Sequence, residues 1–256
     1  MALPLHFQSY GAGPPVVILH GLFGSLNNWH TLAGRLGEHF LVLTIDQRNH
    51  GRSPHSEEFT FQAMAGDLFR FLEDRGLARA SILGHSMGGK TAMEFAFRHP
   101  QMVEKLIVVD IAPRAYQPGH DEILDAMAAL DLSSYSNRAE INRALDSRIP
   151  DLRVRQFILT NLKRYAGGHY TWRINLDVLR RKYGEVTKAQ TSDAPFPGPT
   201  LFLRGELSPY VGDEDLPAIH RLFPAASVCA ISGAGHWVHA DKPEEFFRVI
   251  LHFLGA

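Results

Sequence analysis

The chain has 256 residues, of which 45% are hydrophobic, and its formal net charge at pH 7 is −1. This balance gives no reason to expect nucleic acid or an anionic membrane as a partner, and no stretch approaches the roughly 18 apolar residues that span a bilayer. The N-terminus has no secretory signal pattern, and Cys229 is the single cysteine, so we expect a cytoplasmic protein without an intrachain disulfide.

Short apolar runs alternate with helical patterns along most of the chain. Runs of this length between turns are typical of buried parallel strands, and they span residues 16–19, 41–45, 80–83, 106–109, 200–203 and 226–231. Helical spacing is clearest at 61–74 and 244–254. The alternation predicts an α/β fold with a doubly wound, mostly parallel sheet. In such sheets the active site lies at the carboxyl ends of the strands.

The alternation is interrupted between residues 113 and 190. Three segments there, 123–130, 138–145 and 154–162, have apolar residues spaced by three or four, and none resembles a buried strand. We therefore expect an inserted helical cap at 113–190, on a core domain formed by 1–112 and 191–256. A proline-rich linker at 192–199 would lead back to the sheet.

Residues 84–89 read Gly-His-Ser-Met-Gly-Gly and directly follow the run at 80–83. A serine between small residues at a strand-to-helix turn is typical of a nucleophile elbow, in which the serine oxygen is pushed out of the sheet toward substrate. The pattern predicts Ser86 as a nucleophile.

A serine hydroxyl needs a base, which in this arrangement is a histidine near the end of the chain. His236 follows the last apolar run within a glycine-rich loop, whereas the nearby His239 is better placed to pack at the start of a helix. The third member must be an acid that orients the imidazole.

The commonest pattern places that acid shortly after the strand at 200–203. Here the chain has Ser208 at that position, which leaves Glu206 and Asp213 as local candidates. Asp110 closes the apolar run 106–109 and would point into the same cleft. We favour Asp110, with Glu206 and Asp213 as alternatives.

The oxyanion of an acyl-transfer reaction also needs hydrogen-bond donors. The loop His20-Gly21-Leu22-Phe23-Gly24 follows the first run, and it predicts the amides of Leu22 and Met87 as donors, with Phe23 as the alternative to Leu22. The polar segment 46–53 is expected to support this loop. Asp46 and His50 lack further clustered ligands, so no metal and no cofactor are expected.

Side chains beside these motifs are candidates for substrate contact. They are Phe23, His85, Trp172, Tyr210 and Trp237.

Together these motifs resemble the α/β-hydrolase superfamily over nearly the whole chain. Asn49-His50, the segment 109–113 and the segment 172–176 are similar to those of the bacterial YbfF-type esterases, small cytoplasmic carboxylesterases of which some act on acyl-CoA thioesters. The resemblance implies Ser86 as nucleophile, His236 as base and an acid on the strand before the cap, which matches Asp110. The absence of aspartate at 208 fits this group and departs from the superfamily majority.

The favoured function is a serine carboxylester hydrolase that acts on a small-molecule acyl ester, extending to acyl-CoA thioesters. One alternative is hydrolysis of a carbon–carbon bond by the same triad, and another is a non-enzymatic ligand sensor on a hydrolase scaffold. A dehalogenase is disfavoured, since it would need a carboxylate at position 86. The oligomeric state stays open.

Overall fold

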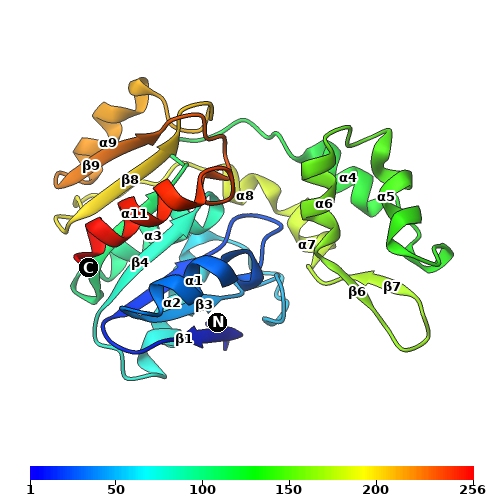
Figure 1. The fold of residues 1–256 in the computed structure, drawn as a ribbon, viewed down its shortest axis with the longest axis horizontal. Coiled ribbons are helices and arrows are strands. Elements are labelled where there is room, and N and C mark those ends of the chain that lie inside the picture. Colours follow the sequence, from blue (N-terminus) through cyan, green and yellow to red (C-terminus); the bar gives the residue numbers. More distant parts are fainter.

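A seven-stranded sheet forms the centre of the computed structural model, which describes residues 1–256 (Figure 1). The strand order is β1-β3-β2-β4-β5-β8-β9, and β1 alone runs antiparallel to its neighbour. The predicted doubly wound, mostly parallel sheet is therefore confirmed. The strands are β1 (Phe7–Tyr10), β2 (Pro15–Leu19), β3 (Leu41–Ile45), β4 (Ala80–His85), β5 (Val103–Val109), β8 (Thr200–Gly205) and β9 (Ala226–Ile231).

Strand β1 was not predicted from the sequence. It is a partly exposed edge strand of only four residues, Phe7–Tyr10, and its sequence lacks the continuous apolar run of the interior strands.

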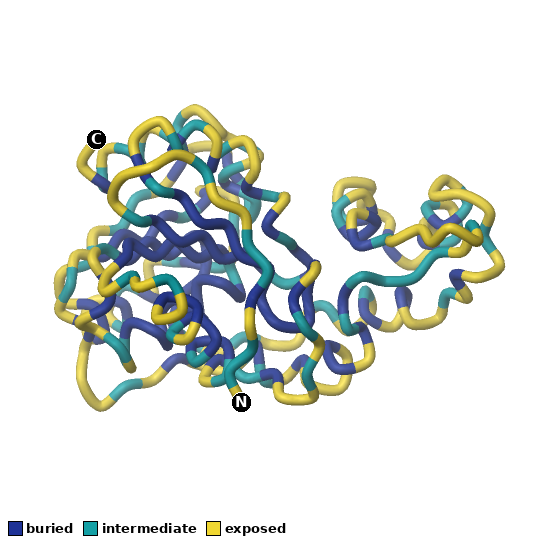
Figure 2. Tube along the Cα trace, turned by 90° about the horizontal axis from the view of Figure 1, so that it is seen from below, coloured by how far each residue is buried: buried dark blue, intermediate teal, exposed yellow.

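Helices cover both faces of the sheet because side chains alternate along each strand. Val17 and Leu19 pack in one apolar cluster with α2, α3 and α9, whereas Val16 and Ile18 pack in another with α1 and α11. Figure 2 shows the buried strands between these outer layers. The helices are α1 (His30–Leu36), α2 (Phe61–Glu73), α3 (Met87–Arg98), α9 (Leu216–Leu222), α10 (Val238–Asp241) and α11 (Pro243–Leu254). None of the helices has the length and apolar character needed to cross a membrane.

Between β5 and β8 the chain leaves the sheet and forms a group of helices, with α4 to α7 set to one side of it in Figure 1. We call residues 113–190 the cap. Its helices are α4 (Asp121–Ala128), α5 (Arg138–Asp146), α6 (Leu152–Leu159), α7 (Leu176–Arg181) and α8 (Tyr183–Thr187).

The cap also contains an antiparallel hairpin, β6 (Leu162–Arg164) and β7 (Tyr170–Trp172), which the sequence did not predict. The helix expected over 154–162 ends at Leu159, and Leu162 already belongs to β6. Strands of three residues with half-exposed side chains have too few alternating positions to be seen as a pattern.

The two stems of the cap lie side by side where they join the core. The amide of Gln190 donates to the carbonyl of Pro113 at 2.6 Å, and the amide of Tyr116 donates to that of Thr187 at 2.8 Å. One apolar cluster combines cap residues with Phe61, Met64 and Met87 of the core. The cap is thereby packed on the end of the sheet at which Ser86 lies.

Candidate active site

Ser86 lies at the turn between β4 and α3, with a φ of 52° and a ψ of −117°. The turn is so tight that a Cβ on Gly84 would lie 2.1 Å from the carbonyl oxygen of Gly88. A Cβ on Gly88 would in turn lie 2.5 Å from the carbonyl oxygen of Leu19. Glycines are therefore required on both sides of the serine, which is why the local sequence folds into an elbow.

Asp110 directly follows β5, is completely buried, and holds His236. Its Oδ2 accepts a hydrogen bond from Nδ1 of His236 at 2.7 Å, and its Oδ1 accepts one from the amide of Gly205 at 2.9 Å. A carboxylate only accepts, so Nδ1 of His236 carries the proton and Nε2 is the nitrogen left free to act as a base.

A third group reaches the same carboxylate. The hydroxyl of Ser208 donates to Oδ2 of Asp110. No role was predicted for Ser208 from the sequence, in which it stands only where an aspartate is common. That position was itself the available signal, because the loop after β8 faces the end of β5.

The two alternative acids lie elsewhere. Glu206 accepts hydrogen bonds from the amide of Gly233 and the hydroxyl of Ser232, each at 2.8 Å, and these lower its pKa. Asp213 forms an ion pair with Arg204 at 2.7 Å, and its side chain is 81% exposed. Neither has a hydrogen bond to His236, so the geometry favours Asp110.

Of the predicted oxyanion donors, the amides of Leu22 and Met87 have no hydrogen-bond partner within the protein. The alternative donor, the amide of Phe23, is already engaged, because it donates to Nε2 of His50 at 3.3 Å. The geometry therefore supports Leu22 rather than Phe23 beside Met87.

The segment 46–53 forms hydrogen bonds with the region of the loop 20–24. The carboxylate of Asp46 accepts hydrogen bonds from the amides of Leu26 and Arg52, each at 2.8 Å. Nε2 of His20 accepts one from the amide of Gln47 at 3.0 Å. No group of three or more His, Cys, Asp or Glu residues has the arrangement to hold a metal ion.

Five histidines around the site are held uncharged by burial, which disfavours the imidazolium form. Burial lowers the pKa of His50 to about 3 and that of His20, His120 and His239 to about 4. Burial also lowers the pKa of His85 well below its usual value. None of the five is hydrogen-bonded to a carboxylate, which sets His236 apart from them.

Backbone strain is concentrated in the same region. The four non-glycine residues with positive φ are Phe23, Asn49, Ser86 and Asp110, which lie in the loop 20–24, in the segment 46–53, at the turn after β4 and at the end of β5. Each such conformation costs on the order of 1–3 kcal/mol and persists only where the surroundings enforce it. This clustering marks the site independently of any motif.

A cavity of about 110 Å³ joins these groups, and we call it the Ser86 cavity. Three of the predicted contact residues, Phe23, His85 and Trp237, line it together with Ser86 and His236. Tyr210 stacks on His236 with 4.1 Å between ring centroids.

Trp172 does not line the Ser86 cavity. Its indole N–H donates to the carbonyl of Met127 at 3.2 Å, and it packs against the apolar cluster of the cap. His120 of the cap does line the cavity, although it was not among the predicted contact residues. Its contact with the cavity depends on how the cap folds back, which no local pattern reports.

Comparison with known proteins identifies the family. Residues 14–243 match the family model described as alpha/beta hydrolase fold. The chain belongs to this family. The resemblance inferred from the motifs is thus confirmed for the superfamily.

Named relatives extend over almost the whole chain. The sn-1-specific diacylglycerol lipase ABHD11 of Xenopus laevis is 43% identical over 250 residues, covering 94% of this chain and 80% of the relative. Esterase YbfF of Escherichia coli (strain K12) is 36% identical over 248 residues, covering 96% of this chain and 95% of the relative. The solved structure of a marine microorganism esterase matches with a TM-score of 0.96 and 43% identity, covering 98% of this chain and all (100%) of the other. These relatives support a hydrolase of the carboxylesterase type.

Proposed function

We propose that this protein is a serine esterase in which Ser86 is the nucleophile, His236 the general base and Asp110 the orienting acid. The observation that carries the proposal is the 2.7 Å hydrogen bond between His236 and a buried Asp110, with Ser86 and His236 on the same cavity. The amides of Leu22 and Met87 stabilise the oxyanion.

In the first half-reaction the Oγ of Ser86 attacks the ester carbonyl carbon while Nε2 of His236 takes its proton. The carbonyl oxygen becomes an oxyanion between the two free amides. When the carbon–oxygen bond to the alcohol breaks, His236 returns the proton to the leaving oxygen and Ser86 retains the acyl group.

In the second half-reaction His236 takes a proton from water, and the resulting hydroxide attacks the acyl-enzyme. The tetrahedral intermediate collapses, the carboxylic acid leaves, and Ser86 regains its proton from His236. Every step uses groups of this chain, so the proposed reaction needs no cofactor.

The proposed substrates are small acyl esters, with acyl-CoA thioesters as an extension of the same chemistry. The same steps apply to oxygen and sulfur leaving groups, because His236 returns the proton taken from Ser86 to whichever atom departs. Acetyl-CoA and p-nitrophenyl acetate therefore form a matched pair for comparison.

The test is hydrolysis of p-nitrophenyl acetate by the wild type and by Ser86→Ala, both checked for folding by thermal melting. We expect the variant to lose several orders of magnitude in kcat, down to the residual level of roughly 10³- to 10⁴-fold over water that binding and the oxyanion site provide. A fluorophosphonate should modify Ser86 in the intact protein. Modification of a different serine, or full activity of Ser86→Ala, would contradict the proposal.

A further inference from the structure

Ser86 lies between two hollows that differ in size and in the residues that line them. One is the Ser86 cavity; the other, which we call the inner pocket, has a volume of about 80 Å³. Ser86, Leu22 and His120 line both. A substrate bonded to the Oγ of Ser86 can therefore extend in either direction.

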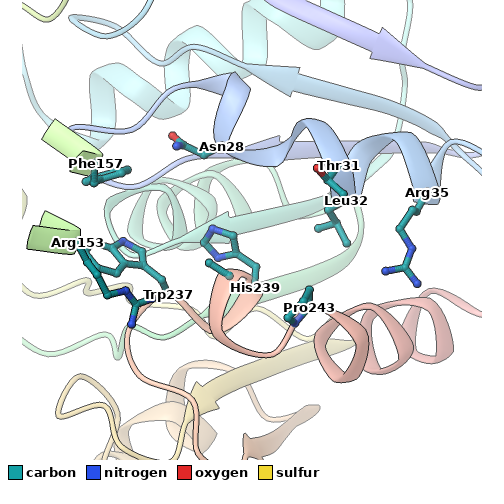
Figure 3. A pocket seen from close by; sticks show the side chains of 10 residues that line it. Asn28, Thr31, Leu32, Arg35, Arg153, Phe157, Trp237, His239 and Pro243 are labelled. Atoms are coloured by element: carbon teal, nitrogen blue, oxygen red, sulfur yellow. The ribbon is translucent and has the colours of Figure 1, made fainter. Parts of the chain in front are cut away.

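The Ser86 cavity continues outward into a larger hollow, the outer groove, with a volume of about 440 Å³. The two share Asn28, Phe157, Trp237 and His239. Figure 3 shows the outer groove between α1, the cap helix α6 and the segment of α10 and α11. On this side the substrate has open space.

The chemistry of the proposed reaction decides which part of the ester takes which side. In the tetrahedral intermediate the carbonyl carbon carries Oγ of Ser86, the oxyanion, the leaving oxygen and the acyl chain. The leaving oxygen must face His236, because His236 protonates it. His236 lines the Ser86 cavity and does not line the inner pocket. The alcohol then lies in the Ser86 cavity, and the acyl chain is left for the inner pocket.

The inner pocket is small. Its volume of about 80 Å³ is less than the volumes of the Ser86 cavity, about 110 Å³, and of the outer groove, about 440 Å³. Its apolar walls include Ile111 and Val186, both buried. An acyl chain that outgrows this volume has to displace these walls or leave the pocket past Gln117 and Gly119, which also line it and are exposed.

The buried polar groups of the inner pocket are already satisfied by the protein. Nζ of Lys90 donates to the carbonyls of Arg114 at 2.9 Å and Lys188 at 2.5 Å. The hydroxyl of Tyr183 accepts from the amide of Gly119 at 3.2 Å and lies 2.6 Å from Nδ1 of His120. The pocket consequently offers no free ammonium group to a charged acyl chain.

We propose that the inner pocket is the acyl subsite and that it restricts the enzyme to short, uncharged acyl groups, while the alcohol part extends through the Ser86 cavity into the outer groove. The inference rests on the proposed function. Val186, at the wall of the inner pocket, is the specificity-determining residue that can be varied without touching the triad.

The first measurement is kcat/KM for p-nitrophenyl acetate, butyrate, hexanoate and octanoate with the wild type. We expect at least a tenfold fall between butyrate and octanoate, since a single methylene that does not fit is worth roughly 10- to 200-fold in specificity. Equal values for butyrate and octanoate would overturn the acyl subsite.

The second measurement compares Val186→Ala, which widens the inner pocket, with Val186→Leu, which narrows it. The ratio of octanoate to acetate kcat/KM should rise about tenfold in the first variant and fall in the second. Thermal melting confirms that each is folded. Two folded variants with the wild-type ratio would contradict the assignment.

The matched control is Val154→Ala, because Val154 lines the Ser86 cavity but not the inner pocket. This variant should change the ratio between methyl acetate and 1-naphthyl acetate and leave the octanoate-to-acetate ratio of the acyl series as in the wild type. If Val154→Ala, and not Val186→Ala, raises the octanoate-to-acetate ratio, the acyl chain binds in the Ser86 cavity and the proposal is wrong.

Failure of the subsite and failure of the proposed function give different results. Hydrolysis that persists in Ser86→Ala would remove the proposed function itself. Hydrolysis that depends on Ser86 but not on acyl length would leave the esterase in place and remove only the acyl subsite.

Discussion

The hydroxyl of Ser208 donates a hydrogen bond to Oδ2 of Asp110, the same oxygen that accepts the Nδ1–H of His236. The two residues are 98 positions apart and follow the neighbouring strands β8 and β5. Asp110 is fully buried, and a buried carboxylate must have its oxygens satisfied. Ser208 thus occupies the position at which the commonest pattern has the acid, and its hydroxyl donates to Asp110, which follows the adjacent strand β5.

Replacing Ser208 tests whether this contact supports the triad. In Ser208→Ala, Oδ2 of Asp110 loses one of its two donors, and hydrogen bonds to charged groups contribute about 1.5–3 kcal/mol. We expect kcat/KM on p-nitrophenyl acetate to fall roughly tenfold, because about 1.4 kcal/mol corresponds to a factor of ten. Ser232→Ala is the matched control, since Ser232 binds Glu206 instead. Equal activities for the two variants would show that the Ser208 contact is unimportant.

Replacing the acids distinguishes Asp110 from the two alternatives. Asp110→Asn keeps the shape but favours the wrong tautomer of His236, so kcat should fall by about 10² or more. The kcat values of Asp213→Asn and Glu206→Gln should stay close to that of the wild type, because both carboxylates are exposed and neither has a hydrogen bond to His236. Steady-state kinetics of the three folded variants decides the matter. An inactive Asp213→Asn or Glu206→Gln beside an active Asp110→Asn would move the acid to the loop after β8.

Much of this site follows from the sequence, because the chemistry lies at strand ends. The apolar runs fix where β4 and β5 end, and a parallel sheet brings such ends to one edge. The elbow, the glycine-rich loop of His236 and Asp110 could therefore be placed near one another without coordinates. The catalytic roles of Ser86, His236 and Asp110 stay predictions until the variants are measured.

The remaining features depend on tertiary packing that no local pattern encodes. The contact between Ser208 and Asp110 needs β8 to lie beside β5, and their separation along the chain hides it. Trp172 and Trp237 are both tryptophans that were predicted to contact substrate, yet only Trp237 lines the Ser86 cavity. Which face of the cap turns toward Ser86 is set by the stems and by the shared apolar cluster, so the sequence could not show that His120 lines the Ser86 cavity and Trp172 does not.

Lys90 is expected to hold the stems of the cap. This buried residue on α3 donates to the carbonyls of Arg114, on the outgoing stem, and Lys188, on the returning stem. In Lys90→Met both carbonyls lose this donor, and a typical hydrogen bond contributes about 0.5–1.5 kcal/mol to stability. We expect a lower free energy of unfolding in urea and faster proteolysis within the cap.

The control for Lys90 is Lys188→Met, in which a side chain that is 62% exposed loses its ion pair with Glu185. Exposed pairs contribute about 0–1 kcal/mol, so this variant should be nearly as stable as the wild type. Equal stabilities for Lys90→Met and Lys188→Met would show that Lys90 does not hold the stems.

The buried histidines predict how stability depends on pH. Burial lowers the pKa of His50 to about 3, whereas an unfolded histidine has a pKa of about 6.5. Between these values the unfolded chain binds a proton at His50 and the folded chain does not, so the free energy of unfolding decreases as the pH falls. The contribution is fully present above pH 6.5, and each pH unit below it removes about 1.4 kcal/mol until the folded pKa is reached.

His50→Gln removes this titration, and the exposed His252→Gln is its control. Glutamine can still accept from the amide of Phe23 and donate to the carbonyl of Arg48, the two contacts of His50. The free energy of unfolding is measured in urea at pH 7.5, 6.5, 5.5 and 4.5. Between pH 6.5 and 4.5 it should fall by about 2–3 kcal/mol less in His50→Gln than in the wild type. His252→Gln should follow the wild type throughout. If His50→Gln loses stability in parallel with the wild type, His50 is protonated in the folded protein and does not hold the loop of Phe23 as a neutral acceptor.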